Sequence, residues 1–232
     1  MSAALRWLPQ GTVYGALLNF RREWDLWAPQ MTEAPYKAAP QAPVLYIKTA
    51  NTFAPCGAAI AVPDEVDVGA TLGLVIGGFE EKLPPALAES AQAATKKEAG
   101  GLHRIAGCVL LNDLSLPHAS YYRPPIKFRN RDGFLGCGPV LQAVPDLSTL
   151  ALELRINGTW AQRIELSTLV RDAATLLRDV SEFTTLQAGD VLMLGTDCLP
   201  DGTRPRAKAG DRIEISAPGF APLVHTLVED PA

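Results

Sequence analysis

Residues 107–113 read Gly-Cys-Val-Leu-Leu-Asn-Asp, an apolar run that ends in two polar residues. The run predicts a buried strand over residues 105–111 with Asn112 and Asp113 at its end. Asp113 has two interpretations. Its carboxylate can bond the backbone amides of a turn, or it can face a binding site at the edge of a sheet. From these residues alone, the turn is the favoured interpretation.

Short apolar segments on both sides of this run predict further strands. They lie at residues 12–19, 44–48, 70–76, 140–143, 150–156, 159–164, 191–194 and 212–216, the last two as a final strand pair. Asn157-Gly158 indicates a tight hairpin turn. Helices are expected at residues 20–27, 86–99 and 166–183, the last amphipathic and packed outside the strands. The order predicts an α+β fold that is mostly β, a mixed β-roll or sandwich with few helices.

Composition fits one domain over residues 1–232, with residues 1–43 as a leading segment and linker. Hydrophobic residues make up 47% and charged residues 20% of the chain, enough to bury a sizeable core. The net charge is −4, and the one dense basic run lies at residues 123–131. An acidic chain with one local basic run favours a small anionic ligand over nucleic acid.

Cysteine and histidine spacing argues against a zinc site or a disulfide framework. The four cysteines lie far apart without a Cys-x-x-Cys pair, and the three histidines have no partners at metal-ligand spacing. The first ten residues show no signal-peptide pattern, and no apolar run reaches a transmembrane length. We therefore expect a cytoplasmic protein.

Residues 115–131 are polar and aromatic without a clear period, which is typical of a functional loop. Its charged side chains, among them Arg123, Lys127 and Arg129, form either a solvated surface or a carboxylate-binding site. The second reading is favoured because a guanidinium pairs with a carboxylate through two hydrogen bonds. Lys48, at the end of a predicted strand, leaves the same two alternatives open.

Several short motifs in this order resemble the fumarylacetoacetate hydrolase family. They are the Asn-Asp strand end at 112–113, Arg-Asp-Gly-Phe at 131–134, Gly-Pro at 138–139, Ala-Gly-Asp at 188–190 and Leu-Gly-Thr at 194–196. The branch that works in 4-hydroxyphenylacetate degradation matches more closely, through residues 112–117, 122–127, 131–134 and 181–183. In that branch, bifunctional isomerase/decarboxylases fuse two such units, and this chain resembles the N-terminal one.

The resemblance implies metal-assisted chemistry on a 2-oxo acid. The family holds a divalent ion, usually Mg²⁺, with a Glu-x-Glu pair and the aspartate of Asn-Asp, and the ion stabilises an enolate. Here the Glu-x-Glu positions fall on Gly69 and Thr71, so Asp113 is the only metal ligand retained. Glu23 replaces a family histidine, and Arg129 replaces a loop lysine. Magnesium binding by this chain is therefore expected to be weak or absent.

The function implied by the resemblance is that of a subunit of an isomerase/decarboxylase for 5-carboxymethyl-2-oxo-hexenedioate-type acids. Its partners would be a di- or tricarboxylate substrate and either a second copy, as a homodimer, or a sister subunit. The alternative is a catalytically silent structural partner of a metal-competent sister subunit. The implied catalytic residues are Asp113, Arg129 and Asp132, and the implied substrate-binding residues are Lys48, Tyr122, Arg123, Lys127 and Thr196.

Overall fold

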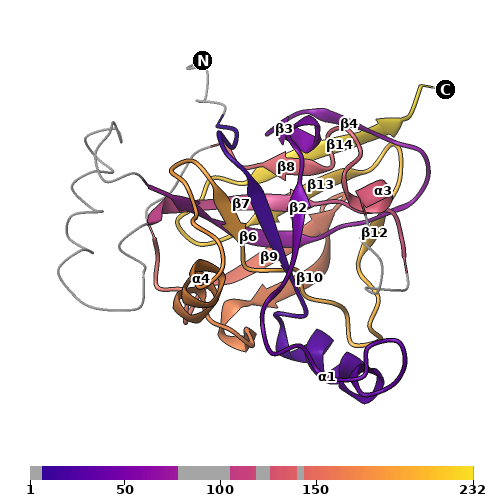
Figure 1. Cartoon of the computed structure of the whole chain (residues 1–232). Helices are drawn as coiled ribbons and strands as arrows, with labels where there is room; N and C mark the ends of the chain where they lie inside the picture. Colours follow the sequence, from indigo (N-terminus) through magenta and orange to yellow (C-terminus); the bar gives the residue numbers. More distant parts are fainter. Residues whose placement is uncertain (1–6, 78–104, 119–125, 140–143, 232) are drawn as a thin grey trace.

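The structure is a computed structural model of the whole chain, and it describes residues 7–77, 105–118, 126–139 and 144–231. Strands dominate this part of the chain. The described α-helices are α1 (Arg21–Met31), α3 (Ile126–Arg129) and α4 (Ala173–Ser181). None of the described helices is both long and apolar enough to cross a membrane. The expected α+β fold with few helices is confirmed (Figure 1).

The larger sheet has seven strands. Their spatial order is β2 (Val44–Lys48), β1 (Val13–Leu17), β11 (Val191–Met193), β6 (Ala70–Ile76), β7 (Ile105–Asp113), β8 (Leu135–Cys137) and β3 (Phe53–Pro55). The edge strands β2 and β3 are joined by residues 49–52 alone. Such a connection spans at most about 18 Å, whereas the edges of a flat seven-stranded sheet lie about 28 Å apart. The sheet must therefore curl until its edges approach, which makes it a roll with an interior.

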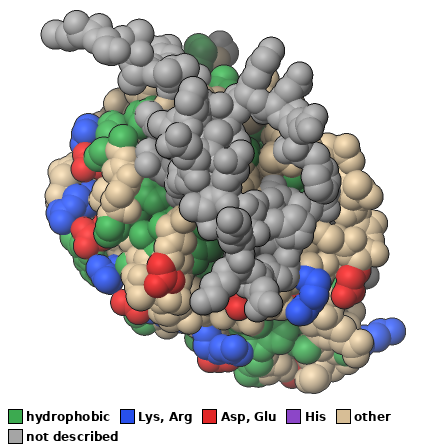
Figure 2. Space-filling view, turned by 90° about the vertical axis from the view of Figure 1, so that its left-hand side faces the viewer, with side chains coloured by type: hydrophobic (Ala, Val, Ile, Leu, Met, Phe, Trp, Pro, Cys, Tyr) green, Lys and Arg blue, Asp and Glu red, His purple; other side chains and the backbone are tan. Residues whose placement is uncertain are grey.

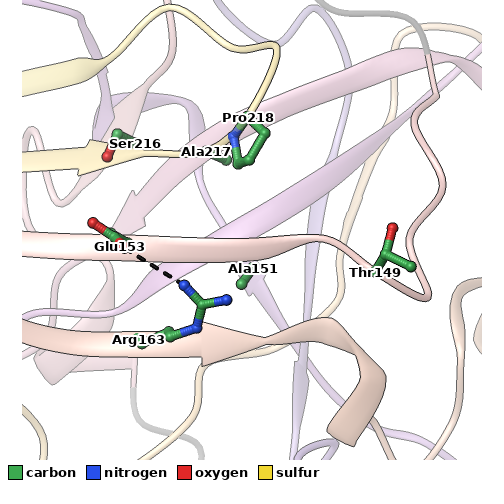
Figure 3. A pocket seen from close by; sticks show the side chains of 7 residues that line it. All are labelled: Thr149, Ala151, Glu153, Arg163, Ser216, Ala217 and Pro218. Carbon is green, nitrogen blue, oxygen red and sulfur yellow. Dashed lines mark ion pairs between the residues drawn. The ribbon is translucent and has the colours of Figure 1, made fainter.

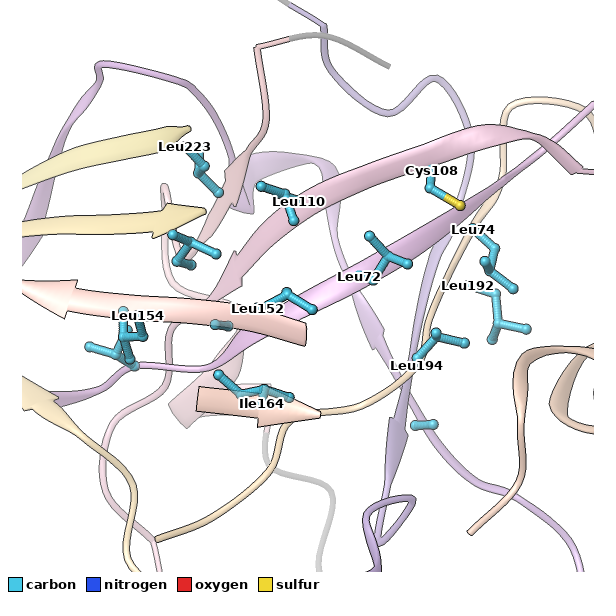
Figure 4. Packing of buried hydrophobic residues seen from close by; sticks show 14 of the residues in the cluster. Leu72, Leu74, Cys108, Leu110, Leu152, Leu154, Ile164, Leu192, Leu194 and Leu223 are labelled. Carbon is cyan, nitrogen blue, oxygen red and sulfur yellow. The ribbon is translucent and has the colours of Figure 1, made fainter. Parts of the chain in front are cut away.

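A second sheet packs against the outside of this roll. Its order is β10 (Thr159–Glu165), β9 (Ala151–Ile156), β13 (Arg212–Ser216), β14 (Leu223–Glu229) and β4 (Ala59–Val62). β12 (Arg206–Ala207) and β5 (Val66–Asp67) form a separate two-stranded ladder, and Asp67 of β5 bridges to Ser115, just after β7. The main core fills the space between the two sheets (Figure 4), with side chains such as Leu72, Leu110, Leu152 and Leu154.

The two faces of β7 lie in two different clusters of buried side chains. Cys108 and Leu110 belong to the core between the sheets, whereas Val109 and Leu111 belong to the interior of the roll. Since side chains alternate along a strand, Asn112 lies on the same face as Cys108 and Leu110. Asp113 lies on the same face as Val109 and Leu111. The apolar run in residues 107–111 is therefore explained by burial on both faces.

Most of the predicted strands are confirmed within a residue or two, and the hairpin at Asn157-Gly158 is confirmed because both residues have a positive φ. The predicted final pair is wrong, since β11 lies in the roll between β1 and β6, and β13 pairs with β9 and β14. The predicted segments at residues 86–99 and 140–143 lie outside the described residues.

The helix predicted over residues 166–183 is shorter in the structure. A 3₁₀ turn covers Leu166–Thr168, and α4 begins only at Ala173. The intervening amides have other partners, because Val170 N donates to the Asn19 carbonyl and Arg171 N donates to the Asn19 side chain. Asp172 then caps α4 by accepting a hydrogen bond from Thr175 N at 2.8 Å. The apolar spacing is real, but capping decides where the helix starts.

The surface shown in Figure 2 carries acidic and basic side chains interspersed with each other over the described residues. Lysine and arginine do not gather into one basic area on this face. A single-sign field of the kind that guides proteins to nucleic acid is therefore not a feature of the described surface on this side.

Candidate functional site

A buried charge cluster closes one end of the roll. Asp113, the last residue of β7, and Lys48, the last residue of β2, point into the interior, and their Oδ1 and Nζ atoms lie 3.0 Å apart. Arg129, from the short helix α3, places its Nη1 2.8 Å from Asp113 Oδ2. The side chains of Lys48 and Asp113 are 0% exposed. Three residues far apart in sequence therefore form one ion-pair network.

Tyr46 completes the network from within the roll. Its hydroxyl donates a short hydrogen bond to Asp113 Oδ2, and its ring lies 4.5 Å from the Arg129 guanidinium carbon. The ring occupies space that only a glycine leaves open on β1, because a β carbon at Gly15 would overlap the Tyr46 ring. Arginine and tyrosine therefore clamp the same carboxylate oxygen.

The pKa values of the cluster follow from burial and pairing. Burial raises the pKa of Asp113, but the charges of Lys48 and Arg129 together lower it by more than burial raises it. The pKa of Asp113 therefore lies below its ordinary value. Burial lowers the pKa of Lys48, against the opposing effect of Asp113. Burial, and then the Asp113 charge, raise the pKa of Tyr46 well above its ordinary value. Tyr46 therefore stays protonated and remains a donor to the Asp113 carboxylate.

Lys48 has no solvent-facing role in this arrangement. Besides its ion pair with Asp113, Nζ donates to the carbonyls of Leu114 at 3.3 Å, Phe134 at 2.9 Å and Arg129. An ammonium group has three protons, so these acceptors already use its full capacity. The turn interpretation of Asp113 is also replaced, because its carboxylate contacts three side chains from two other elements, β2 and α3.

A second ion pair lies beside the first. Glu23, in the first turn of α1, accepts from Arg204 Nη2 at 2.6 Å and from Leu18 N at 3.1 Å. Arg204 Nε also donates to Thr196 Oγ1 at 3.2 Å. The Glu23 side chain is 3% exposed and the Arg204 side chain 12%. Sequence reasoning did not identify Arg204, which stands in a Pro-Gly-Arg loop with no motif to single it out.

Gly69 lies where the two ion pairs meet. A β carbon there would lie 2.6 Å from Thr196 Cγ2 and 2.7 Å from the Asp113 carbonyl oxygen. Thr196 carries the hydroxyl that holds Arg204, and Asp113 carries the first cluster. Thr196 and Asp113 therefore fill the space that a side chain at Gly69 would need.

The residues present do not fit a divalent cation. A magnesium ion takes oxygen ligands in near-octahedral geometry, and it is held by carboxylates whose negative charge is not already paired with protein cations. Asp113 is already paired with Lys48 and Arg129, Thr71 is neutral, and Gly69 has no room for a side chain. Within the described residues, no three carboxylate, imidazole or thiolate groups gather as a metal site. A Gly69→Glu exchange would therefore fail to build one for steric reasons.

The remaining predicted site residues are placed as follows. Asp132 is exposed and accepts a hydrogen bond from Asn51 Nδ2 at 2.6 Å, and Lys127 is exposed on α3. Thr196 is buried, with Arg204 as its partner. Tyr122 and Arg123 lie outside the described residues. The structure therefore unites Lys48, Asp113 and Arg129 in one network and places Thr196 next to it.

A separate hollow lies on the second sheet, away from these charges. Its volume is about 310 Å³. It is lined by Thr149, Ala151, Glu153, Arg163, Ser216, Ala217 and Pro218 (Figure 3). Arg163 Nη1 and Glu153 Oε1, both in its lining, form an ion pair at 3.5 Å. Both side chains are more than one third exposed, so the pair is screened by solvent and contributes little. This hollow lacks the buried polar side chains that would be expected of a specific ligand-binding site.

Comparison with known proteins identifies related chains. A bifunctional isomerase/decarboxylase of 4-hydroxyphenylacetate degradation from Escherichia coli is 37% identical over 95% of this chain and 48% of its own length. The chain thus spans about half the length of that relative. A 5-carboxymethyl-2-hydroxymuconate delta-isomerase structure from Mycobacterium smegmatis is 25% identical, with a TM-score of 0.70 over 95% of this chain and 80% of the other.

A more distant structure shares the fold. It is a maleylpyruvate hydrolase from Sphingobium sp. SYK-6 in complex with manganese(II) and pyruvate, with a TM-score of 0.66 and 18% identity over 96% of this chain and 72% of the other. The family described as Fumarylacetoacetate (FAA) hydrolase C-terminal matches residues 12–228. The roll, the motifs along it and this match over nearly the whole chain agree, and the chain belongs to the fumarylacetoacetate hydrolase family.

Proposed function

We propose that the chain is one subunit of an isomerase/decarboxylase that acts on 5-carboxymethyl-2-oxo-hexenedioate-type acids in homoprotocatechuate catabolism. The relation to the Escherichia coli enzyme, about half of whose length this chain matches, supports the pathway. The observation that carries the proposal is the buried charge at the end of the roll. Among the described residues, the cations Lys48, Arg129 and Arg204 gather there next to Asp113 and Glu23. The buried carboxylate of Asp197 also acts on Arg204 and Glu23.

This gathering of ammonium and guanidinium groups favours a polycarboxylate. A di- or tricarboxylate brings several carboxylate groups, and a guanidinium pairs with a carboxylate through two hydrogen bonds. In this proposal Asp113 orients Lys48, Arg129 and Tyr46, and Arg204 and Thr196 lie next to the ligand.

The test is an activity assay of the purified chain, alone and mixed with a sister subunit that carries an intact Glu-x-Glu pair, with and without magnesium. Loss of the dienedioate absorbance reports turnover. We expect turnover in the mixture to exceed that of the sister subunit alone. Equal turnover with and without this chain would contradict the proposal.

A catalytically silent structural partner is the second candidate, and the crowding at Gly69 favours it. Thr196→Val in this chain separates the two candidates, because the change removes one hydroxyl and keeps the shape. If the subunit binds substrate, turnover of the mixture falls. If the subunit is silent, turnover stays constant while light scattering shows an intact complex. The same scattering experiment tests the expectation of a dimer, which a monomer at micromolar concentration would contradict.

A further inference from the structure

Asn112 and His225 are two buried polar side chains that meet at the same glycine. Asn112, on β7, is 0% exposed and is paired across the strands with Gly136 of β8. His225, on β14 of the second sheet, is 1% exposed, and a β carbon on Gly136 would overlap its ring. β14 packs against both β7 and β8. The two side chains therefore converge on one place in the core between the sheets.

The described residues leave the hydrogen-bonding capacity of both side chains unused. Among them, the amide oxygen and nitrogen of Asn112 and both ring nitrogens of His225 have no partner of hydrogen-bond geometry. The Ala58 carbonyl is near enough to act on the pKa of His225, but it accepts its hydrogen bond from Thr226 N, at 3.3 Å. Folded proteins normally satisfy buried polar atoms with protein groups or with water, because unpaired ones are costly. Four such atoms at one place indicate a bound molecule.

The surroundings of this place decide the kind of molecule. Leu110 of β7 and Leu223 of β14 lie in the same core (Figure 4), so the neighbouring surface is apolar. Burial lowers the pKa of His225 to about 4, which keeps the ring neutral near neutral pH. An ion would lack a counter-charge there. An amide and a neutral imidazole each offer a donor and an acceptor, and the matching ligand is therefore a neutral molecule that also donates and accepts.

The spacing of the two side chains favours water as that molecule. The β carbons of cross-strand partners lie about 5 Å apart, and the His225 ring takes the place of the missing one on Gly136. The amide and the ring are therefore close without a direct hydrogen bond between them. We propose that Asn112 and His225 bind one internal water molecule, which joins the second sheet to the strand end that carries Asp113. Internal waters typically make about three such hydrogen bonds.

Magnetic relaxation dispersion of the water oxygen nucleus tests the proposal on the full chain, because it counts internal waters that exchange slowly with the solvent. Asn112→Leu and His225→Leu should each lose one such water relative to the unmodified chain, since a buried water needs at least two polar partners. The double variant should lose the same single water. An equal count in all of these chains would overturn the proposal. A loss of two waters from the double variant would also overturn it, because each side chain would then hold its own.

Leu110→Met is the matched control, because it changes the same face of β7 at nearly constant volume. Its count should equal that of the unmodified chain. Circular dichroism shows whether each variant is folded. If the leucine variants do not fold, the unmodified chain still decides, because the side-chain amide of Asn112 should show a nuclear Overhauser effect to a long-lived water. Absence of that effect, or a direct hydrogen bond between the two side chains, would contradict the proposal.

Discussion

Asn112 and Asp113 are neighbours at the end of β7, yet their side chains meet opposite environments. Asp113 points into the roll, where Lys48, Arg129 and Tyr46 contact its two oxygens. Asn112 points between the sheets and is 0% exposed, and neither polar atom of its side chain has a partner among the described residues. The comparison shows that one strand end presents a charge with partners on one face and an isolated neutral amide on the other.

His225 belongs to the Asn112 side of this comparison. It lies on β14, is 1% exposed, and occupies space that Gly136 leaves open, since a β carbon at Gly136 would overlap its ring. Asn112 is paired with Gly136 across β7 and β8. Burial lowers the pKa of His225 to about 4, against the opposing effect of a backbone hydrogen bond. The region between the sheets thus keeps its polar groups neutral, whereas the roll end keeps them charged and paired.

The largest effect is expected from Asp113→Leu. The exchange leaves Lys48 and Arg129 buried without their counter-ion, which costs about 3–5 kcal/mol of unfolding free energy. Urea denaturation followed by circular dichroism measures it. Lys48→Met in the same chain should recover part of the loss because it removes one of the two unpaired cations. A loss below about 1 kcal/mol, a surface-pair value, would contradict the paired-cluster account.

Acid should destabilise the chain through His225. The folded pKa of about 4 lies below the ordinary value of 6.5, so the unfolded state binds the proton more tightly and stability falls as pH drops through this window. The expected loss from about pH 7 to about pH 5 is about 2 kcal/mol. His225→Gln should lose this part of the dependence. An unchanged pH profile in that variant would show that other groups are responsible.

The smallest effect is expected from Asn112→Leu. Replacing an amide that has no described partner removes a desolvation cost, and the larger apolar side chain offsets this gain by tight packing. We expect a change within about 1 kcal/mol in either direction. Urea denaturation of this variant beside Asp113→Leu gives a direct comparison of the two faces. Losses of similar size would remove the contrast between them.

Most of the fold could be predicted from sequence, for identifiable reasons. Residues 70–76 are predicted and observed as a strand because both of their faces are apolar. The Asn157-Gly158 turn is fixed locally by its backbone preference. The start of α4 and the partners of β11 depend on contacts with Asn19 and β1, which lie more than a hundred residues away. Local patterns contain no information on such contacts.

The site was predictable in part. Lys48, Asp113, Arg129 and Thr196 could be singled out by strand ends and motifs, and the structure brings them to one end of the roll. Arg204 and Tyr46 had no such signal. Their roles arise from the curl of the sheet and from the open spaces at Gly15 and Gly69, and the charge balance of the site follows only once these neighbours are known.

The carboxylate of Asp113 is paired with internal cations, and we therefore expect that it does not hold a metal ion. Titration calorimetry of magnesium into the unmodified, EDTA-treated chain measures this. We expect no saturable heat at magnesium concentrations up to about a millimolar, the range in which even weak extracellular-type sites for divalent cations fill. Stoichiometric magnesium binding that disappears in Asp113→Asn would contradict it.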